Sequence, residues 1–172
     1  TPLIGIEPSA ILTFRDEYPD LVDDDQLEDA RRLAANSLLI DEFLLREIRS
    51  HRIRREQFTK ERRVIKFHGH CQQKAAKAAT CSEEILSFPL NYQVEVIPSG
   101  CCGMAGSFGY EKEHYDLSMK IADLVLLPEI KQAPKDAIIA STGTSCRHQI
   151  LDGAGQRAFH PVEVLYQALA TR

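Results

Sequence analysis

The stretch VIKFHGHCQQKAAKAATCSEEIL, residues 64–86, decides the fold because it joins a strand pattern directly to a helix pattern. Its first part, Val64–His68, is rich in β-branched and aromatic side chains and predicts a strand. The following residues, Gln72–Leu86, predict a helix. A strand that leads into a helix is the unit from which parallel sheets are built.

The same alternation of strand and helix recurs along the chain. We predict a buried strand at Leu3–Glu7 and further strands at Val94–Ile97 and Ala137–Ser141. Helical patterns are predicted at residues 9–18, 26–39, 40–48 and 111–127, near residue 146, and at residues 162–169. Right-handed crossovers between such strands give a mostly parallel sheet with flanking helices. We therefore expect an α/β fold, and one domain over residues 1–172, because no low-complexity linker divides the chain.

A faint internal repeat accompanies this order. The motifs GIEPSA (Gly5–Ala10) and STGTSC (Ser141–Cys146) each follow a strand rich in isoleucine and precede a helix. Related patterns come later in each half, DEFL at Asp41–Leu44 and VEVL at Val162–Leu165. If the repeat is real, the first copy has an alanine where the second has Cys146.

Composition limits the classes of function. The formal net charge is -4, which argues against nucleic acid as a partner because that binding needs an excess of positive charge. No apolar run approaches the roughly 20 residues that cross a bilayer. The chain starts with Thr1, so we expect a fragment of a longer protein. Its five cysteines come without a secretory signal, which favours a cytoplasmic location and thiols that bind metal or carry redox chemistry.

Four of the five cysteines follow predicted strands. We call this set the strand-end cysteines: Cys71, Cys101, Cys102 and Cys146. Loops at the carboxyl ends of parallel strands gather along one edge of a sheet, where ligands bind. The four thiols are therefore expected to meet in one pocket as metal ligands. The side chains of His70, His148 and His160 are expected to neighbour this pocket, where hydrogen bonds to ligand sulfurs would tune a metal centre.

The tetrapeptide GCCG, Gly100–Gly103, indicates what kind of group the thiols bind. Adjacent residues in a strand point to opposite faces, so two neighbouring thiolates serve one group only if the backbone bends. Flanking glycines permit such a bend. A cluster of several irons uses ligands from different directions at short range, whereas structural zinc sites favour cysteines two to four residues apart. We also expect helix N-termini to favour the thiolate forms of Cys71 and Cys146.

Simpler interpretations stand beside this one. Cys81 lies inside a helical pattern and is expected to be a small buried hydrophobe. The glycines of residues 100–109 are compatible with a phosphate loop, although the lysine and hydroxyl residue of a P-loop are missing. The basic stretch Arg49–Arg63 is interpreted as a solvated helix face, with a docking surface for a partner or anionic lipid as the alternative.

Three segments resemble the cysteine-rich CCG domain: HGHCQQKA (His68–Ala75), PSGCCGMAGSFGYEKEHYDLS (Pro98–Ser118) and STGTSCRHQI (Ser141–Ile150). This domain forms the C-terminal iron–sulfur part of FAD-linked oxidases of the D-lactate, D-2-hydroxyglutarate and glycolate dehydrogenase type. It also occurs in heterodisulfide reductase and in glycerol-3-phosphate oxidases. The resemblance implies the end of a first CCG repeat and a complete second repeat.

The resemblance implies electron transfer. The chain would be the C-terminal fragment of a larger flavin-linked oxidoreductase, with FAD on a domain outside it. The strand-end cysteines would hold an iron–sulfur cluster of the 4Fe–4S type. The implied partners are flavin and ferredoxin-like domains of the parent chain and a quinone or other acceptor. The fragment alone is expected to be inactive, in the cytoplasm or peripheral at the inner face of a membrane.

Two departures from the family pattern keep alternatives open. The family pattern often ends in C-x-x-C; in this chain Cys146 stands at the second cysteine position and Gly143 at the first. The first-repeat motif of the family usually reads EPSC, whereas this chain reads EPSA and ends the motif with Ala10. The competing hypotheses are a zinc-bound structural or docking module, an empty site, and a thiol enzyme that uses Cys101 and Cys102 directly. Directly adjacent cysteines form only a strained disulfide, which disfavours the thiol enzyme.

Overall fold

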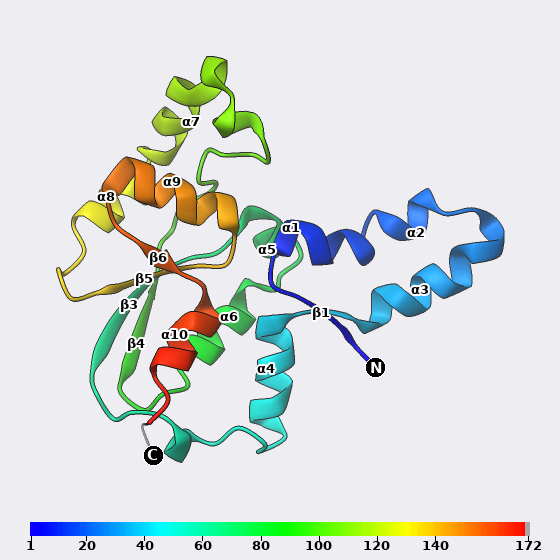
Figure 1. Ribbon diagram of the computed structural model, residues 1–172, viewed down its shortest axis with the longest axis horizontal. Helices are drawn as coiled ribbons and strands as arrows, with labels where there is room; N and C mark the ends of the chain where they lie inside the picture. Colours follow the sequence, from blue (N-terminus) through cyan, green and yellow to red (C-terminus); the bar gives the residue numbers. More distant parts are fainter. Residues whose placement is uncertain (171–172) are drawn as a thin grey trace.

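A four-stranded parallel sheet forms the centre of the computed structural model, which describes residues 1–170 (Figure 1). The strand order is β4-β3-β5-β6. Their bounds are β3 (Arg63–His68), β4 (Tyr92–Val96), β5 (Ile138–Ser141) and β6 (Ala158–Phe159). The predicted α/β fold with a parallel sheet is confirmed. Three of these strands coincide with predicted ones, and β6 was not predicted.

Helices cover both faces of this sheet. Alternate strand residues point to opposite faces, so Ile65 and Phe67 pack with Leu86 and Val164 on one face. Ile139 instead packs with residues of the helices on the other face. The first face carries α6 (Ala79–Leu86) and α10 (Pro161–Gln167), and the second carries α8 (Leu126–Lys131) and α9 (Thr144–Ala154).

A second, two-stranded parallel sheet stands beside the first. It pairs β1 (Leu3–Gly5) with β2 (Ser37–Leu39). Two expectations need correction here. The β1 strand is not buried, because Leu3 and Ile4 are 39% and 38% exposed. The helix predicted over residues 26–39 ends earlier, as α3 (Leu27–Asn36), because the buried residues of β2 hydrogen-bond to β1 instead.

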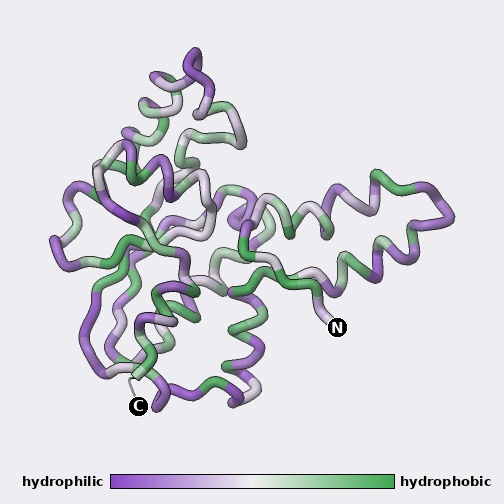
Figure 2. Tube along the Cα trace, viewed as in Figure 1, coloured by the Kyte–Doolittle hydropathy of each residue, from purple (hydrophilic) through white to green (hydrophobic). Residues whose placement is uncertain are grey.

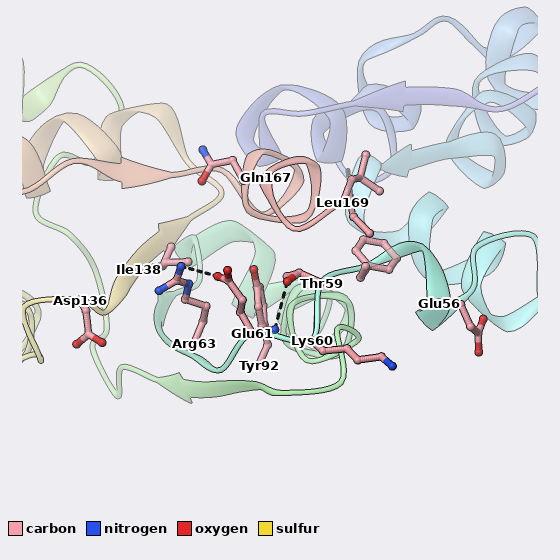
Figure 3. Close-up of a pocket in the computed structure, with 12 residues that line it drawn as sticks. Glu56, Thr59, Lys60, Glu61, Arg63, Tyr92, Asp136, Ile138, Gln167 and Leu169 are labelled. Atoms are coloured by element: carbon pink, nitrogen blue, oxygen red, sulfur yellow. Dashed lines mark hydrogen bonds and ion pairs between the residues drawn. The ribbon is translucent and has the colours of Figure 1, made fainter. Parts of the chain in front are cut away.

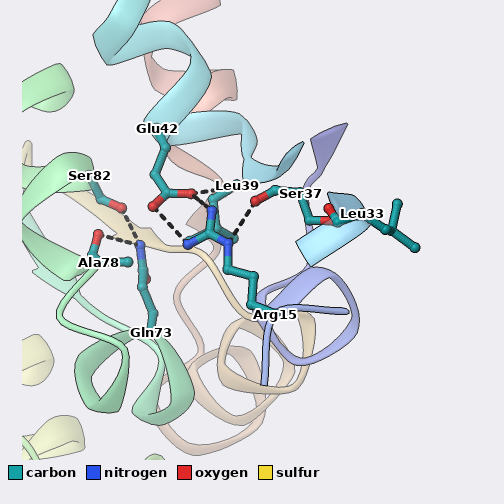
Figure 4. Close-up of polar contacts among 8 residues, drawn as sticks. All are labelled: Arg15, Leu33, Ser37, Leu39, Glu42, Gln73, Ala78 and Ser82. Carbon is teal, nitrogen blue, oxygen red and sulfur yellow. Dashed lines mark hydrogen bonds and ion pairs between the residues drawn. The ribbon is translucent and has the colours of Figure 1, made fainter. Parts of the chain in front are cut away.

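The connection from β1 to β2 forms an arm that projects away from the sheets (Figure 1). It contains α1 (Pro8–Ile11), η1 (Leu12–Phe14), α2 (Tyr18–Leu21), η2 (Asp24–Gln26) and α3. Hydrophobic and hydrophilic residues alternate along it (Figure 2). At its base the Arg15 guanidinium binds the Glu42 carboxylate and the Ser37 carbonyl oxygen, which ties the arm to β2 (Figure 4).

The internal repeat has a structural counterpart. β1 leads through the arm, which begins with α1, to β2 and α4 (Ile40–Arg49), and β5 leads through α9 to β6 and α10. Both final helices begin in the same way. The Glu42 carboxylate accepts from the Leu39 backbone N–H, and the Glu163 carboxylate accepts from the His160 backbone N–H, each at 2.8–2.9 Å. The chain thus holds two copies of one β–α–β–α order.

Several predicted helices are shorter than expected. The helix over Gln72–Leu86 splits into α5 (Cys71–Ala75) and α6, with Lys77 at a positive φ of 55° between them. The helix over residues 111–127 splits into η5 (Lys112–His114), α7 (Tyr115–Ala122) and α8, and Pro128 lies inside the first turn of α8 rather than beyond the helix.

The basic stretch of residues 49–63 is not a helix face. Beyond the end of α4 it forms a turn and bend at residues 50–53, then η3 (Arg55–Gln57) and an extended segment that leads into β3. Among residues 1–170, no helix has the length and apolar character needed to span a membrane.

Candidate metal centre

The carboxyl ends of three adjacent strands position all the strand-end cysteines. Cys71 opens α5, just after β3. The Cys101–Cys102 pair lies in the loop after β4, and Cys146 is in the first turn of α9, after β5. Because these strands are parallel neighbours, the loops that follow them lie at the same edge of the sheet.

The centre of this edge is a buried group of three side chains. The ligand atoms of His68, Cys102 and Cys146 all lie within 4.8 Å of one another. The three residues are 0%, 4% and 1% exposed. Both sulfurs belong to the apolar cluster formed with α8 and α9, which keeps bulk water away from them. Thiol and imidazole groups at this spacing are a donor set for a transition metal.

The other two strand-end cysteines extend the group toward solvent. The Cys101 thiol lies close enough to the thiols of Cys102 and Cys71 to shift pKa values within the group. Its sulfur also accepts from the Gly103 backbone N–H at 3.3 Å. Cys71 is exposed, whereas Cys101 is half-buried. The thiols therefore form a continuous series from the surface to the buried centre.

Residue His68 was not among the sequence-predicted site residues. It is the last residue of β3, and its Nδ1 lies 2.7 Å from the Ser99 hydroxyl in the loop after β4. Its Nε2 is buried and has no hydrogen-bond partner among residues 1–170. Its position at the end of a strand, three residues before a cysteine, was the signal that could have identified it.

The close packing of these groups shifts the pKa values of the thiols and the imidazole. Contact with the Cys102 thiol, followed by burial, raises the pKa of Cys101. The contact with Cys101 lowers the pKa of Cys102, but contact with Cys146 and burial outweigh it and raise the value to about 12. Burial lowers the pKa of His68 to about 3, so its imidazole is neutral, the form that binds metal. Metal binding must therefore release thiol protons.

One electrostatic expectation was wrong. Burial, followed by the neighbouring Cys101, raises the pKa of Cys71 rather than lowering it. The helix that Cys71 opens has only five residues, and the backbone N–H groups at its start lower the pKa less than these two effects raise it.

The GCCG loop is held in shape from two sides. Gly103 has a φ of +94°, and a Cβ there would lie 2.2 Å from the Ser118 carbonyl oxygen, so the position requires glycine. The Lys74 ammonium donates to the carbonyl oxygens of Ser99 and Gly100, at 2.5 and 3.1 Å. These contacts fix the loop that carries Cys101 and Cys102.

The three histidines expected near the site have other contacts. His70 Nδ1 accepts from the Gln72 backbone N–H at the start of α5. His148 bonds the Tyr110 hydroxyl at 2.7 Å, and His160 contacts the Ile6 carbonyl oxygen at 3.1 Å. None of the three belongs to the buried donor group found within the described residues.

The fifth cysteine and a surface pocket both lie away from this edge of the sheet. Cys81 is in α6, partly exposed, and packs against the cluster around Leu45 and Ile85. A surface pocket of about 790 Å³ lies at the opposite edge of the sheet, next to the first residues of three strands, Arg63, Tyr92 and Ile138 (Figure 3). Its charged and polar walls do not converge on the cysteines, so it has no part in the metal centre.

Comparisons with known proteins place the chain among parts of dehydrogenases. It is 30% identical over 171 residues to a D-2-hydroxyglutarate dehydrogenase of Pantoea ananatis, and 29% identical to that of Escherichia coli K12. These matches cover 98% of this chain and 16% of each relative. It is also 28% identical over 173 residues to one subunit of the anaerobic glycerol-3-phosphate dehydrogenase of Escherichia coli K12, covering 98% of this chain and 41% of that protein.

No family model matches the chain. No solved structure matches it significantly. The similarity thus extends to segments of larger oxidoreductases over nearly the whole chain, and the CCG-domain assignment itself remains a prediction.

Proposed function

We propose that this chain is the iron–sulfur electron-transfer domain of a flavin-linked dehydrogenase that oxidises a D-2-hydroxy acid. The observation that carries the proposal is the buried donor group, with two further thiols beside it, in a chain similar over 98% of its length to parts of D-2-hydroxyglutarate dehydrogenases. The chain covers only 16% of those relatives, so their substrate and their other domains enter here as part of the proposal.

The donor set fits such a centre chemically. Cysteine thiolates are the usual ligands of iron–sulfur clusters, and imidazole replaces them in some. The ligand atoms of the buried group lie within 4.8 Å of one another, a spacing that suits a single metal ion. A cluster of several irons is larger, so the thiol side chains would have to rotate apart to hold it. A bound iron–sulfur cluster would supply one-electron transfer. The strand-end cysteines would hold it, with flavin as the electron donor and a quinone or other carrier as the acceptor.

The surrounding residues prepare the site for this role. Packing of Cys102 and Cys146 in the apolar cluster excludes water from the inner side. Lys74 places one positive charge beside the thiols and fixes the loop, which offsets part of the negative charge of several thiolates. The exposed side, at Cys71, is where an electron-transfer partner would approach.

A zinc-bound structural module is the second candidate, and the close spacing of the three buried donors favours it. Zinc–sulfur bonds of about 2.3 Å place tetrahedral ligand atoms roughly 4 Å apart. Such a module would position a partner domain without redox activity.

Metal analysis of the anaerobically purified chain separates the two candidates. The iron–sulfur proposal predicts iron with acid-labile sulfide and a centre that dithionite reduces reversibly. It also predicts no turnover of D-2-hydroxyglutarate or D-lactate with a dye acceptor unless a flavoprotein is added. Stoichiometric zinc without iron or sulfide would support the structural module, and turnover by the chain alone would overturn both.

A further inference from the structure

We infer that His68 is a direct ligand of the metal centre, which makes it a mixed cysteine and histidine site. The inference deepens the proposed function, since it concerns the same centre. It rests on His68 itself, which neither the CCG motif nor the cysteine spacing indicates.

The first argument is hydrogen-bond satisfaction. His68 is fully buried, and its Nε2 has no partner in the part of the chain that the structure describes. A buried polar atom without a partner has lost its hydrogen bonds to water without replacement, so such atoms are rare unless something binds them. One ring nitrogen of His68 lies within 4.8 Å of the sulfurs of Cys102 and Cys146, and a metal ion bound by the ring and the two sulfurs would give Nε2 the partner it lacks.

The second argument is the orientation of the ring. Nδ1 lies 2.7 Å from the Ser99 hydroxyl, which is also buried. When Nδ1–H donates to this oxygen, Nε2 carries a free lone pair, which is the form of the ring that binds a metal ion. Metal-bound histidines usually carry such an outer partner, which fixes the tautomer. Ser99 thus acts as a positioning residue for His68.

The third argument concerns Gly143, which stands at a position where the family pattern has a cysteine. A Cβ at Gly143 would lie 2.4 Å from the His70 ring and 3.1 Å from the Cys146 sulfur. The space for a ligand from this side is therefore filled. The imidazole of His68, which approaches from β3, supplies a further donor instead.

A rival role is a hydrogen bond from Nε2–H to a ligand sulfur, with the ring in the other tautomer. The two roles differ in magnetic coupling. A directly bound nitrogen is coupled strongly to the electron spin of a reduced cluster, whereas a hydrogen-bonded one is coupled only weakly.

The test uses the whole chain labelled with ¹⁵N-histidine, with its cluster reconstituted and then reduced. Pulsed EPR should detect a strongly coupled nitrogen in the wild type and in His148→Gln, and none in His68→Gln. Absence of this coupling in a wild-type chain that holds iron and sulfide would overturn the ligand assignment and leave the proposed function standing.

If the chain takes up zinc instead, X-ray absorption reports the same assignment. A zinc shell with one nitrogen that becomes all sulfur or oxygen in His68→Cys supports the His68 ligand even though the iron–sulfur proposal has failed. A wild-type shell of sulfur alone overturns it. A chain that binds neither metal overturns both proposals.

Ser99→Ala tests the positioning role. Loss of an outer-shell partner typically lowers metal affinity 10–100-fold. A competing chelator should therefore remove metal from Ser99→Ala at a correspondingly lower concentration than from wild type, while the nitrogen signal persists at saturating metal. Unchanged affinity would show that Ser99 does not orient His68.

Discussion

The Glu7 carboxylate accepts a hydrogen bond from the backbone N–H of Thr144, 2.8 Å away, although 137 positions separate the two residues. Glu7 follows β1 and Thr144 opens α9, so the contact joins equivalent loops of the two β–α–β–α copies. The carboxylate lies at the N-terminus of the helix whose first turn carries Cys146, where negative charge is favoured.

Replacing Glu7 by alanine should lower the free energy of unfolding by about 1.5–3 kcal/mol, the usual value of a hydrogen bond to a charged group. Burial raises the pKa of Glu7, but the hydrogen bonds with Thr144 and Ser9 outweigh it and leave the value lowered. The contribution is therefore present above the ordinary carboxyl pKa and is lost as the pH falls below it. Urea titration measures the change. Glu17→Ala, at an exposed position, is the control, and equal losses in both variants would contradict the interpretation.

Alanine at Gly103 should disrupt the GCCG loop. The positive φ and the 2.2 Å approach of the Ser118 carbonyl oxygen require the backbone to move, which should cost at least about 2–3 kcal/mol and reduce metal binding. Gly100→Ala is the matched control, because nothing lies within 4 Å of its Cβ. Thermal unfolding and metal content measure the effect. Similar behaviour of the two variants would show that the loop does not depend on its conformation at Gly103.

Loss of metal should distinguish Cys102 from Cys81. Cys102→Ala removes a buried donor at the centre of the group and should abolish stoichiometric metal binding. Cys81→Ala changes a helix residue packed in a different cluster and should leave metal content at the wild-type level. Elemental analysis of both variants, purified in parallel, gives the answer. Equal loss would mean that the metal is held elsewhere.

The buried carboxyl group of Asp41 should give stability a distinctive pH dependence. Burial raises its pKa to about 6, against the lowering effect of its hydrogen bond with the Ser82 hydroxyl. One carboxylate oxygen, Oδ1, has no partner within the described residues. Because the folded pKa exceeds the unfolded one, the stability that Asp41 contributes is complete at low pH. It is lost as the pH rises through about 6.

Asp41→Asn should therefore gain stability relative to wild type between about pH 4 and pH 7.5, by up to roughly 3 kcal/mol. The lowered pKa values of His68 and His160 act in the opposite direction, since they destabilise the fold in acid. Both histidines are present in the two proteins, so the difference between the denaturation curves isolates Asp41. A difference that does not change with pH would contradict the raised pKa.

Local sequence predicted those parts of the fold that local residues determine. Val64–His68 and Ala137–Ser141 form strands close to the predicted bounds, because runs of β-branched and apolar residues are buried on both faces of a parallel sheet. Because the strand ends were predicted, the positions of Cys71 and Cys146 just after β3 and β5 could be predicted as well.

Features that depend on distant partners could not be predicted in this way. Ser37–Leu39 is a strand only because β1, more than thirty positions earlier, pairs with it. His68 was interpreted as an ordinary strand residue. Its role depends on the loop after β4, which supplies Ser99 and Cys102, and on the placement of Cys146 after β5. The split at Lys77 depends on one residue with a positive φ that no periodicity indicates.

The gradient of exposure across the thiols gives the centre an order of chemical vulnerability. Cys71 faces solvent, Cys101 is half-buried, and Cys102 and Cys146 are enclosed. Because susceptibility to oxidation increases with exposure, a peroxide or an alkylating reagent in solution reaches Cys71 before the enclosed donors. The part of the centre that is open to an electron-transfer partner is thus also the part that is open to chemical attack.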